Sequence, residues 1–592
     1  MHNFHNFHNF IHVSAAVPKL VLGNPVANEK EIIKIIKDAH EKGLHVLVLP
    51  ELCLCGVTCG DLFFQPTLIN KCQQAIAQIE KETEGTTVLA FVGAPILIHG
   101  KLYNCMVAIS GGYILAKIAK HPTIEQTRWF STPKHREKSL FSMGNTTLEI
   151  IQPTNESRFS KAQIIIDPWA VPINAMEDKV AQAKALGIGR ALIQVGPGMM
   201  ESSTDMVYNG HSIIAENGKL LAKGEEYSQN TTTIATTIDI DMLDPRYKPV
   251  GKKAIFVKGF EEKPAINLIN RKISSAPFVL EKEKLAVAIK ATQAALVRRI
   301  LHVGAKKAIV GVSGGVDSTL ALITTVEAFK MMGKDPKDVI AITMPGFGTS
   351  NKTYSNATNI IKATGASFKE ISIVNAVNQH FDDIGLDSAK KDITYENAQA
   401  RERTQILMDI ANMENGLVVG SGGMSENALG FSTYGGDHIS MYNVNGGLPK
   451  TLIIAMLRHI QQTNDTLSQP LEEILTTPIS PELLPPTDDG QMSQKTEELI
   501  GSYLLNDFFL YYTLKNIAPK KILFLAGQAF ENLQEEEIKN HLQKFYKRFF
   551  TNQYKRSCAT DGPAVIGYSL SPRGGYIMPS DMTVQAWLED ID

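Results

Sequence analysis

The residues best suited to chemistry form a glycine-rich loop, which reads Gly311-Val312-Ser313-Gly314-Gly315-Val316-Asp317-Ser318. The loop follows an apolar run at 308–310, expected to be a strand, and precedes a helical pattern expected from Leu320. Glycines at the end of a strand let the backbone approach a ligand, and free N–H groups at the next helix start point at anionic oxygens. Asp317 adds a carboxylate that suits Mg²⁺ bridging phosphates. The loop therefore predicts a nucleotide phosphate site.

Two other interpretations compete with this one: an ordinary turn, which the further residues of the string disfavour, and a hydrolase site, which stays open as the alternative. A Gly-Gly pair after a strand can be an ordinary turn. The spacing of Gly311, Ser313 and Gly315 also matches the nucleophile elbow of α/β-hydrolases, with Asp437 and His438 downstream as its partners. That alternative gives no role to Asp317. No lysine follows the glycines, so the loop is not of the Gly-x4-Gly-Lys kind.

The loop resembles the Ser-Gly-Gly-x-Asp-Ser loop of the ATP pyrophosphatases, and downstream strings narrow the choice to one member of that group. From about Leu285 to Asp581 the chain closely resembles the NAD synthetase domain. The strings that carry the resemblance are Met344 to Ser350, Asn397 to Arg403, Gly420 to Glu426, Phe431 to Asp437, Pro449-Lys450-Thr451, Ser480 to Leu483 and Ser571-Pro572-Arg573.

The resemblance implies a ligase that uses ATP and Mg²⁺ to convert deamido-NAD+ to NAD+. It implies that the substrate carboxylate is adenylylated with release of pyrophosphate, and that ammonia then displaces AMP from the adenylylated carboxylate. Asp317 and Glu426 would share the magnesium ion. The ATP phosphates would contact the loop, above all Ser313, Gly315 and Ser318, together with Ser421, Lys450 and Ser480. Deamido-NAD+ would contact Asn397, Arg401, Glu426, Phe431, Ser432, Thr433, Tyr434, Asp437 and Lys555.

The first half resembles the nitrilase-like glutaminase domain that the longer NAD synthetases carry to supply ammonia. Glu51 would be the general base and Lys120 would stabilise the oxyanion. Where that family has Ile-Cys-Glu-Asp-x-Trp, this chain reads Ile164-Ile165-Ile166-Asp167-Pro168-Trp169, which puts Ile165 at the nucleophile. Isoleucine cannot attack an amide. We therefore expect an inactive amidase and synthesis that depends on ammonia.

Other differences at the amidase site support this expectation. Gln126 stands near the place of a tyrosine that would contact glutamine, and the stretch from Ala185 to Glu201 lacks the expected Ser and Arg. The alternative is a displaced nucleophile among Cys53, Cys55 and Cys59. We expect these cysteines to be small buried core residues instead.

Hydrophobic periodicity places these residues on layered α/β elements. In the first half we expect strands near 11–13, 45–49, 88–93, 113–119 and 163–166, and a helix capped by Asn28, in a nitrilase-like α-β-β-α sandwich over 10–260. A linker over 261–284 leads to a synthetase domain over 285–592. Strands at 308–310, 339–343 and 417–419 predict a doubly wound parallel sheet, and Lys539 to Lys555 predicts an exposed helix.

Composition limits the remaining classes. The 592 residues are 44% hydrophobic and 20% charged, with a formal net charge of -2, so a global attraction to nucleic acid or to an anionic membrane is not expected. Six cysteines indicate a reducing cytoplasm rather than a disulfide framework. The opening His-Asn-Phe repeat is expected to be a variable end. The family resemblance also implies a homo-oligomer.

Overall fold

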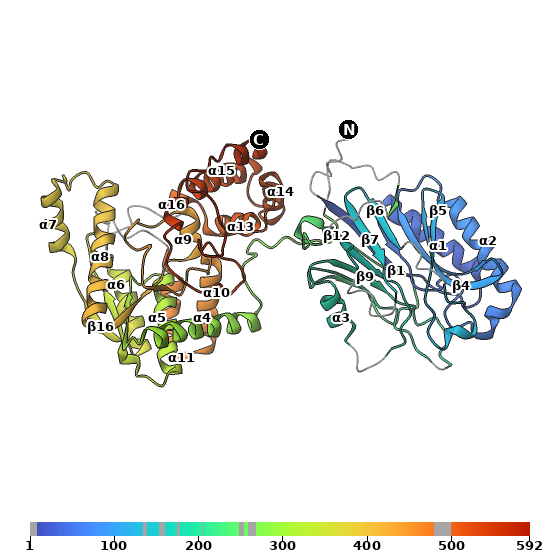
Figure 1. Ribbon diagram of the computed structural model, residues 1–592, viewed down its shortest axis with the longest axis horizontal. Helices are drawn as coiled ribbons and strands as arrows, with labels where there is room; N and C mark the ends of the chain where they lie inside the picture. The colour runs from blue at the N-terminus through green and yellow to red at the C-terminus, as the bar shows by residue number, and fades with distance from the viewer. Residues whose placement is uncertain are drawn as a thin grey trace. The chain divides into compact units, whose positions relative to one another are not determined.

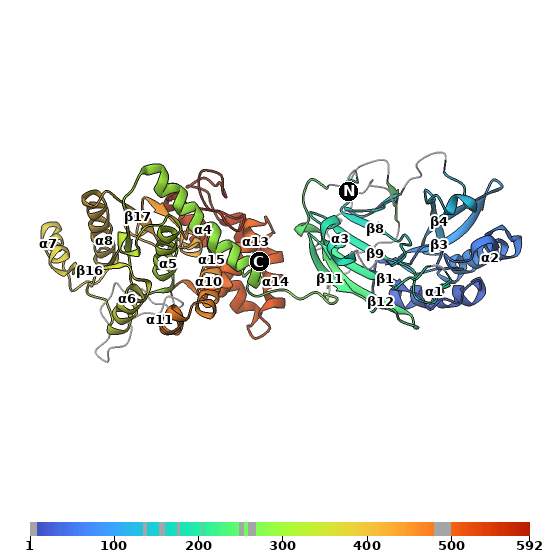
Figure 2. The ribbon, with the colours of Figure 1, turned by 90° about the horizontal axis from the view of Figure 1, so that it is seen from below.

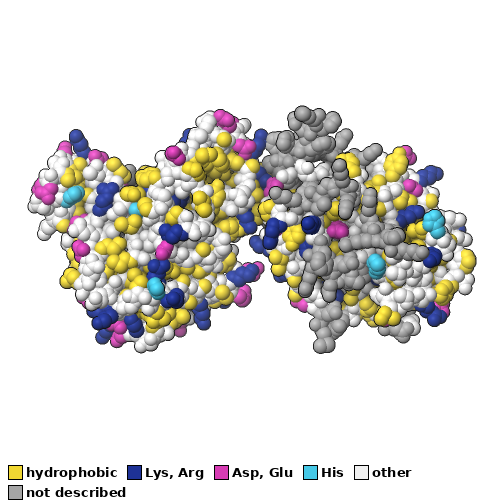
Figure 3. All heavy atoms as spheres, in the orientation of Figure 1, with side chains coloured by type: hydrophobic (Ala, Val, Ile, Leu, Met, Phe, Trp, Pro, Cys, Tyr) yellow, Lys and Arg dark blue, Asp and Glu magenta, His cyan; other side chains and the backbone are white. Residues whose placement is uncertain are grey.

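The computed structural model describes residues 9–133, 139–152, 160–173, 178–204, 206–247, 254–257, 268–478 and 499–592. The chain divides into two compact units, Met1–Arg271 and Lys272–Asp592 (Figure 1). In the described ranges, each helix is too short or too polar to cross a bilayer. On the face shown in Figure 3, basic and acidic side chains are interspersed on both units.

The first unit has two sheets packed face to face, with helices outside them. The six-stranded sheet runs β12 (Thr232–Asp239), β1 (Phe10–Val17), β2 (Val46–Val48), β3 (Leu89–Ile98), β4 (Lys101–Ser110) and β5 (Tyr113–Ala119). The seven-stranded sheet runs β11 (Lys219–Lys223), β10 (Ser212–Glu216), β9 (Ala191–Val195), β8 (Ile164–Asp167), β7 (Thr146–Ile150), β6 (Leu140–Met143) and β13 (Ile255–Phe256). Helices α1 (Pro25–Glu41) and α2 (Pro66–Glu82) cover the first sheet and α3 (Lys179–Leu186) covers the second (Figure 1).

The residues between the sheets explain why this sandwich forms. Side chains alternate along a strand, so one set faces the partner sheet and the other faces a helix. In β8, Ile164 and Ile166 join the core between the sheets, whereas Ile165 packs toward α3. The expected α-β-β-α sandwich is confirmed.

The start of α1 differs from the expectation that Asn28 caps it. The helix begins at Pro25, and the Asn24 side chain accepts from the Ala27 N–H. Proline suits the first helical position because its missing N–H has no helical partner there. Asn28 is buried inside the helix, where its amide donates to the carbonyls of Val21 and Leu54.

The second unit is built on a parallel sheet in the order β16 (Ser367–Glu370), β15 (Val339–Thr343), β14 (Lys307–Gly311), β17 (Gly416–Gly420) and β18 (Tyr442–Asn443). One face packs on α4 (Lys282–Val303), α5 (Val316–Met331), α6 (Asn351–Thr364), α10 (Lys450–Thr463) and α11 (Asp465–Leu475). The other packs on α7 (Val374–Ile384) and α8 (Ile393–Met413) (Figure 2). The predicted doubly wound sheet is confirmed.

The remaining helices of this unit gather near its carboxyl-terminal end. They are α9 (Met424–Leu429), α13 (Tyr503–Leu514), α14 (Pro519–Ala529), α15 (Glu535–Thr551), α16 (Gln553–Arg556) and α17 (Gln585–Ile591). The expectation of an exposed helix over Lys539 to Lys555 is only half right, because α15 buries an aromatic face that includes Phe545 and Phe549. Lys555 belongs to the separate short helix α16.

Candidate active site

The sheet order places two loops of the second unit at one point. Strands β15 and β17 flank β14 on opposite sides, so the chain reverses its direction of travel across the sheet between β14 and β17. In open α/β sheets, ligands bind beyond the carboxyl ends of the strands at such a switch point. The loop after β14 carries Ser313 to Ser318, and the loop after β17 carries Ser421 to Glu426. Both loops were singled out by the sequence.

Gly314 and two serines shape the loop after β14. Gly314 has φ +86°, and a Cβ there would lie 2.2 Å from the Thr353 carbonyl oxygen, so only glycine fits. The Ser318 hydroxyl accepts from the Ser313 N–H at 3.2 Å and donates to the Gly315 carbonyl at 3.1 Å. Helix α5 begins at Val316, four residues before the expected start. Its first N–H groups therefore face the loop, as a phosphate site requires.

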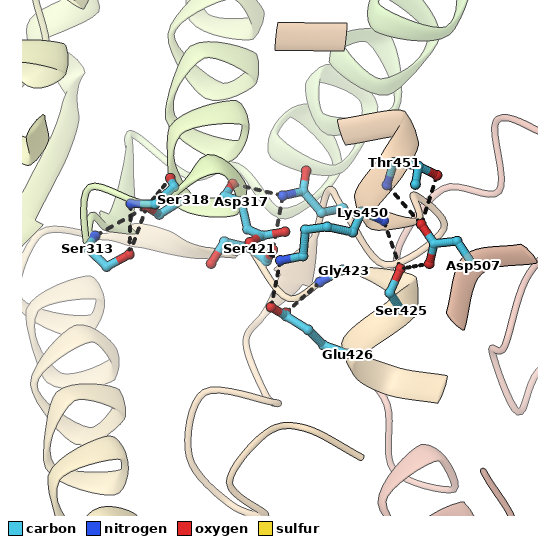
Figure 4. A network of polar contacts seen from close by, with 12 residues as sticks. Ser313, Asp317, Ser318, Ser421, Gly423, Ser425, Glu426, Lys450, Thr451 and Asp507 are labelled. Atoms are coloured by element: carbon cyan, nitrogen blue, oxygen red, sulfur yellow. Dashed lines mark hydrogen bonds and ion pairs between the residues drawn. The ribbon is translucent and has the colours of Figure 1, made fainter. Parts of the chain in front are cut away.

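Three charged side chains meet between the two loops. Lys450, the first residue of α10, places Nζ 2.9 Å from Glu426 Oε1 and in contact with Asp317 Oδ2 (Figure 4). The Lys450 side chain is 1% exposed. Burial opposes its charge, but the two carboxylates outweigh burial and raise the pKa of Lys450. Burial and the nearby Glu426 raise the pKa of Asp317 to about 6, although Lys450 opposes this rise.

The carboxylates of Asp317 and Glu426 fit the predicted metal. Asp317 Oδ1 is buried and has no hydrogen-bond partner among the described residues. Glu426 Oε2 accepts the Gly423 N–H at 3.1 Å, which orients its carboxylate. Hard carboxylate oxygens are what Mg²⁺ prefers. The structure places Lys450 Nζ on these carboxylates, where the resemblance had suggested the ATP phosphates.

Residues expected to bind the dinucleotide form a second cluster beside α9. The Thr433 hydroxyl donates to Asn397 Oδ1 at 2.8 Å, and the Thr433 N–H donates to Asp437 Oδ1 at 2.7 Å. Arg401 Nε donates to the Tyr434 carbonyl at 3.2 Å. Lys555 Nζ lies 2.8 Å from the Gly430 carbonyl and 2.7 Å from that of Ser432. The structure thus brings these sequence-predicted residues together.

One of the two aromatic residues of this cluster, Tyr434, is accessible. Tyr434 is 46% exposed and stacks on His438, with ring centroids 5.0 Å apart. Phe431 is anchored through its N–H, which donates to the Glu426 carbonyl at 2.9 Å. The cluster is therefore linked by backbone to the carboxylate that contacts Lys450. Ser480, predicted near the ATP phosphates, lies outside the described residues.

The first unit contains a separate buried polar centre. Lys120 Nζ lies 2.8 Å from both carboxylate oxygens of Glu51, and the two side chains are 1% and 0% exposed. Glu51 Oε1 also accepts from Asn104 Nδ2 at 2.5 Å and from Gln126 Nε2 at 2.9 Å. Glu51 Oε2 accepts the Ala170 N–H at 2.6 Å. The predicted base and lysine therefore meet, and protein donors occupy both oxygens of the base.

The structure does not bring Ile165 to this ion pair. Ile165 lies within β8 and packs with Ala183 and Leu192 under α3. The residues that follow β8, Pro168 and Trp169, do approach this ion pair. Pro168 accepts the Glu51 N–H at 2.8 Å, and the Trp169 ring centroid lies 5.4 Å from Lys120 Nζ. A strand shows its residues to alternate faces, so a shift along β8 changes which side chain faces the base.

The cysteines near Glu51 are core residues, as expected. Cys53, Cys55 and Cys59 are buried. Burial raises the pKa of Cys53 to about 12, and its thiol points to the Gly93 carbonyl. A thiol with so high a pKa contains almost no thiolate at neutral pH.

Comparison with known proteins agrees with both halves of this description. A family model described as NAD synthase matches residues 288–559, and one described as carbon-nitrogen hydrolase matches residues 21–176. A Mycobacterium leprae protein named glutamine-dependent NAD(+) synthetase is 30% identical, with 98% of each chain covered. The chain belongs to the glutamine-dependent NAD(+) synthetase family.

The chain is also similar to more distant proteins. A protein of the same name from Aquifex aeolicus is 24% identical, covering 94% of this chain and 96% of the relative. A crystal structure described as a glutamine-dependent NAD(+) synthetase from Cytophaga hutchinsonii is 19% identical, covers 98% of this chain and 100% of that chain, and has a TM-score of 0.45.

Membership of the synthetase family agrees with the contacts of Ser313. Its hydroxyl lies 3.2 Å from the Ser318 hydroxyl, whereas His438 Nε2 lies 3.5 Å from Cys558 Sγ and its Nδ1 accepts the Gly435 N–H. No contact among the described residues joins Ser313 to His438 as a hydrolase triad would require. The nucleophile-elbow alternative is wrong.

Two residues that contact the loops after β14 and β17, Asn445 and Asp507, were not predicted from the sequence. The Asn445 amide donates to the carbonyls of Asp317 and Ser421, at 2.9 and 3.0 Å, and so joins the two loops. Asp507 on α13 contacts Ser425 and Thr451. Asp507 had a usable signal, because a carboxylate within the apolar run from Tyr503 to Leu514 is seldom buried without a partner. Asn445 had no such signal, because its spacing along the chain does not indicate which residues it contacts.

Proposed function

We propose that this protein is a ligase that forms NAD+ from deamido-NAD+, ATP and ammonia. The observation that carries the proposal is the meeting of Asp317, Glu426 and Lys450 at the switch point of the parallel sheet. A reaction that places an anionic carboxylate against the α-phosphorus of ATP needs cations and N–H donors there. The loop after β14 and the start of α10 supply both.

Two clusters of residues would bind different parts of the substrates: the centre around Lys450 would bind ATP, and the Thr433 cluster would bind the dinucleotide. The N–H groups at the start of α5 and the hydroxyls of Ser313 and Ser318 would bind phosphate oxygens. Asp317 and Glu426 would hold Mg²⁺, which supplies charge neutralisation on those oxygens. The nicotinate carboxylate would bond to the α-phosphorus as pyrophosphate leaves. Ammonia would then attack the acyl carbon, AMP would leave, and one ammonia proton would pass to solvent.

The Thr433 cluster would hold the dinucleotide. Lys555 uses two of its three N–H donors on the carbonyls of Gly430 and Ser432, which leaves one for a phosphate oxygen. Arg401 uses Nε on Tyr434, and its other nitrogens remain suited to an anion. Tyr434, which is 46% exposed, suits contact with a flat heteroaromatic ring.

Ammonia as the nitrogen source is supported by the first unit. Amide hydrolysis by this family's chemistry needs a thiolate beside the base. The segment that reaches Glu51 offers Pro168, Trp169 and Ala170, none of which is nucleophilic. Cys53 is buried with a raised pKa. We therefore assign the first unit a structural role.

The decisive experiment supplies the purified protein with deamido-NAD+, ATP and Mg²⁺, and compares ammonium chloride with glutamine in ammonium-free buffer. NAD+ and AMP should form with ammonium alone, in equal amounts. With glutamine, neither NAD+ nor glutamate should appear. Glutamate formed in proportion to NAD+, and lost in both Glu51→Gln and Cys53→Ser, would overturn the ammonia proposal and show a displaced nucleophile. No NAD+ with either donor would overturn the synthetase proposal.

A further inference from the structure

Helix α10, which carries Lys450 at its first position, lacks a cap of its own. The residue at its N-cap position is Pro449, and no side-chain hydrogen bond caps the helix from there. The first N–H groups of a helix have no partner within it, and leaving them unpaired in a buried place is costly. Lys450 is buried, so these donors need partners from elsewhere in the fold.

Ser425 and Asp507 supply those partners from two other helices (Figure 4). The Lys450 N–H donates to the Ser425 hydroxyl at 2.8 Å. The N–H and the hydroxyl of Thr451 both donate to Asp507 Oδ2, each at 2.8 Å. The Ser425 hydroxyl donates in turn to Asp507 Oδ1. One carboxylate from α13 therefore completes the start of α10 and holds the first turn of α9.

This connection bears directly on the charged centre. Asp507 joins Ser425 to Thr451. Ser425 immediately precedes Glu426 on α9, and Thr451 immediately follows Lys450 on α10, so each of the two residues is the neighbour of a charged residue of the centre. The side chains of these two charged residues meet each other, with Lys450 Nζ 2.9 Å from Glu426 Oε1. Asp507 is fully buried, so water cannot take over its hydrogen bonds.

We propose that Asp507 is a positioning residue for NAD+ synthesis, which sets the separation of α9 and α10 and thereby the placement of Glu426 and Lys450. This inference rests on the proposed synthetase function. Asp507 contacts neither of these side chains' charged ends, and acts through Ser425 and Thr451. Small displacements of catalytic groups cost large factors in rate, so a residue that fixes two of them at once should act mainly on kcat.

The test compares Asp507→Ala and Asp507→Asn with the control Asn464→Ala. Asn464 caps the neighbouring helix α11 by accepting the Leu467 N–H, so its loss removes a cap of the same kind away from the centre. Asp507→Ala should lower kcat about 30-fold while changing the KM for deamido-NAD+ less than two-fold. It should raise the Mg²⁺ concentration needed for half-maximal activity about 10-fold, because a group supporting a metal ligand is lost. Asn464→Ala should change neither.

Asp507→Asn separates positioning from folding. Its amide oxygen can still accept from Thr451, but its NH₂ group cannot accept the Ser425 hydroxyl proton. It should therefore keep the wild-type melting temperature within a few degrees and still lose about five-fold in kcat. Ser425→Ala should lose a similar factor, and combining the two should add little, because both break one link. If Asp507→Ala does not fold, these two variants decide the matter.

Calorimetric binding of MgATP, without deamido-NAD+, gives a readout that needs no turnover. Asp507→Asn should weaken binding several-fold, and Asn464→Ala should not. Wild-type kcat and MgATP affinity in both Asp507→Asn and Ser425→Ala would overturn the positioning role while leaving the synthetase proposal intact. A wild-type protein that binds MgATP but forms no NAD+ would refute the synthetase proposal, and the binding comparison would still decide whether Asp507 organises the centre.

Discussion

Lys120 and Glu51 form an ion pair with both carboxylate oxygens 2.8 Å from one ammonium group, inside the first unit and almost wholly removed from solvent. Such a pair is costly to break, because the partner left behind is a buried charge. In this protein the pair is also surrounded by donors from Asn104, Gln126 and Ala170. We infer that this ion pair stabilises the fold of the first unit.

We predict that Glu51→Gln lowers the free energy of unfolding of the first unit by about 3 kcal/mol, because Lys120 loses its counter-ion. Urea unfolding followed by tryptophan fluorescence measures this loss. The double variant Glu51→Gln with Lys120→Met should lose less than the single variant, since no charge remains unpaired. Ammonia-dependent NAD+ formation in the folded single variant should stay within two-fold of wild type. A larger fall would mean that the pair serves the synthesis.

Asp317→Asn should abolish AMP and NAD+ formation, with a fall of at least about 100-fold, and leave the protein folded. The amide keeps the shape of the carboxylate, but removes the charge that faces Lys450 and the proposed metal. The matched control is Asp392→Asn at the exposed cap of α8, where an amide oxygen can still accept the helix N–H groups. Turnover above a tenth of wild type in Asp317→Asn would refute the metal assignment.

Lys555→Ala should raise the KM for deamido-NAD+ about 10-fold, and that for ATP less than two-fold, because Lys555 lies in the Thr433 cluster rather than beside the loop after β14. Lys547→Ala, an exposed lysine of α15, serves as the control and should change neither KM. Equal effects of Lys555→Ala on both substrates would place the residue outside the dinucleotide site.

The pH dependence of stability should reveal the pair of stacked histidines, His12 and His45. Burial, with a smaller contribution from His12, lowers the pKa of His45 to about 3. The unfolded chain should titrate near 6.5, so it binds more protons than the folded protein between these values. Stability is then full above pH 6.5 and decreases as the pH falls toward 3, by up to about 1.4 kcal/mol per pH unit for His45.

Urea unfolding at pH 8, 6 and 5 measures this slope. His45→Gln should flatten it, although it loses some stability at pH 8 because His45 Nδ1 accepts the His12 N–H at 2.9 Å. His99→Asn is the control, since His99 is exposed and its positive φ suits asparagine. An unchanged slope in His45→Gln would show that other groups control the pH dependence.

The sequence predicted most of the elements and the place of the glycine-rich loop between β14 and α5, because hydrophobic periodicity and glycine spacing are local signals. It could not place Ile165, since one residue of shift along β8 reverses which side chains face the ion pair, and the register is set by β7 and β9. It missed Asn445 and Asp507 for a related reason. Their partners lie 24 to 128 residues away along the chain, and only the folded sheet and helices bring them together.

The Asn445 side-chain amide donates two hydrogen bonds, one to a carbonyl of each of two different loops. Those loops follow neighbouring strands but are separated by about a hundred positions in the sequence, so no hydrogen bond of the sheet itself ties them beyond the strand ends. A fluctuation that lifts one loop must break its bond to Asn445 or carry the other loop with it. The loop after β14 and the loop after β17 should therefore open and close as a single cooperative unit, with amide protons of both loops reporting one common free energy of opening in hydrogen exchange.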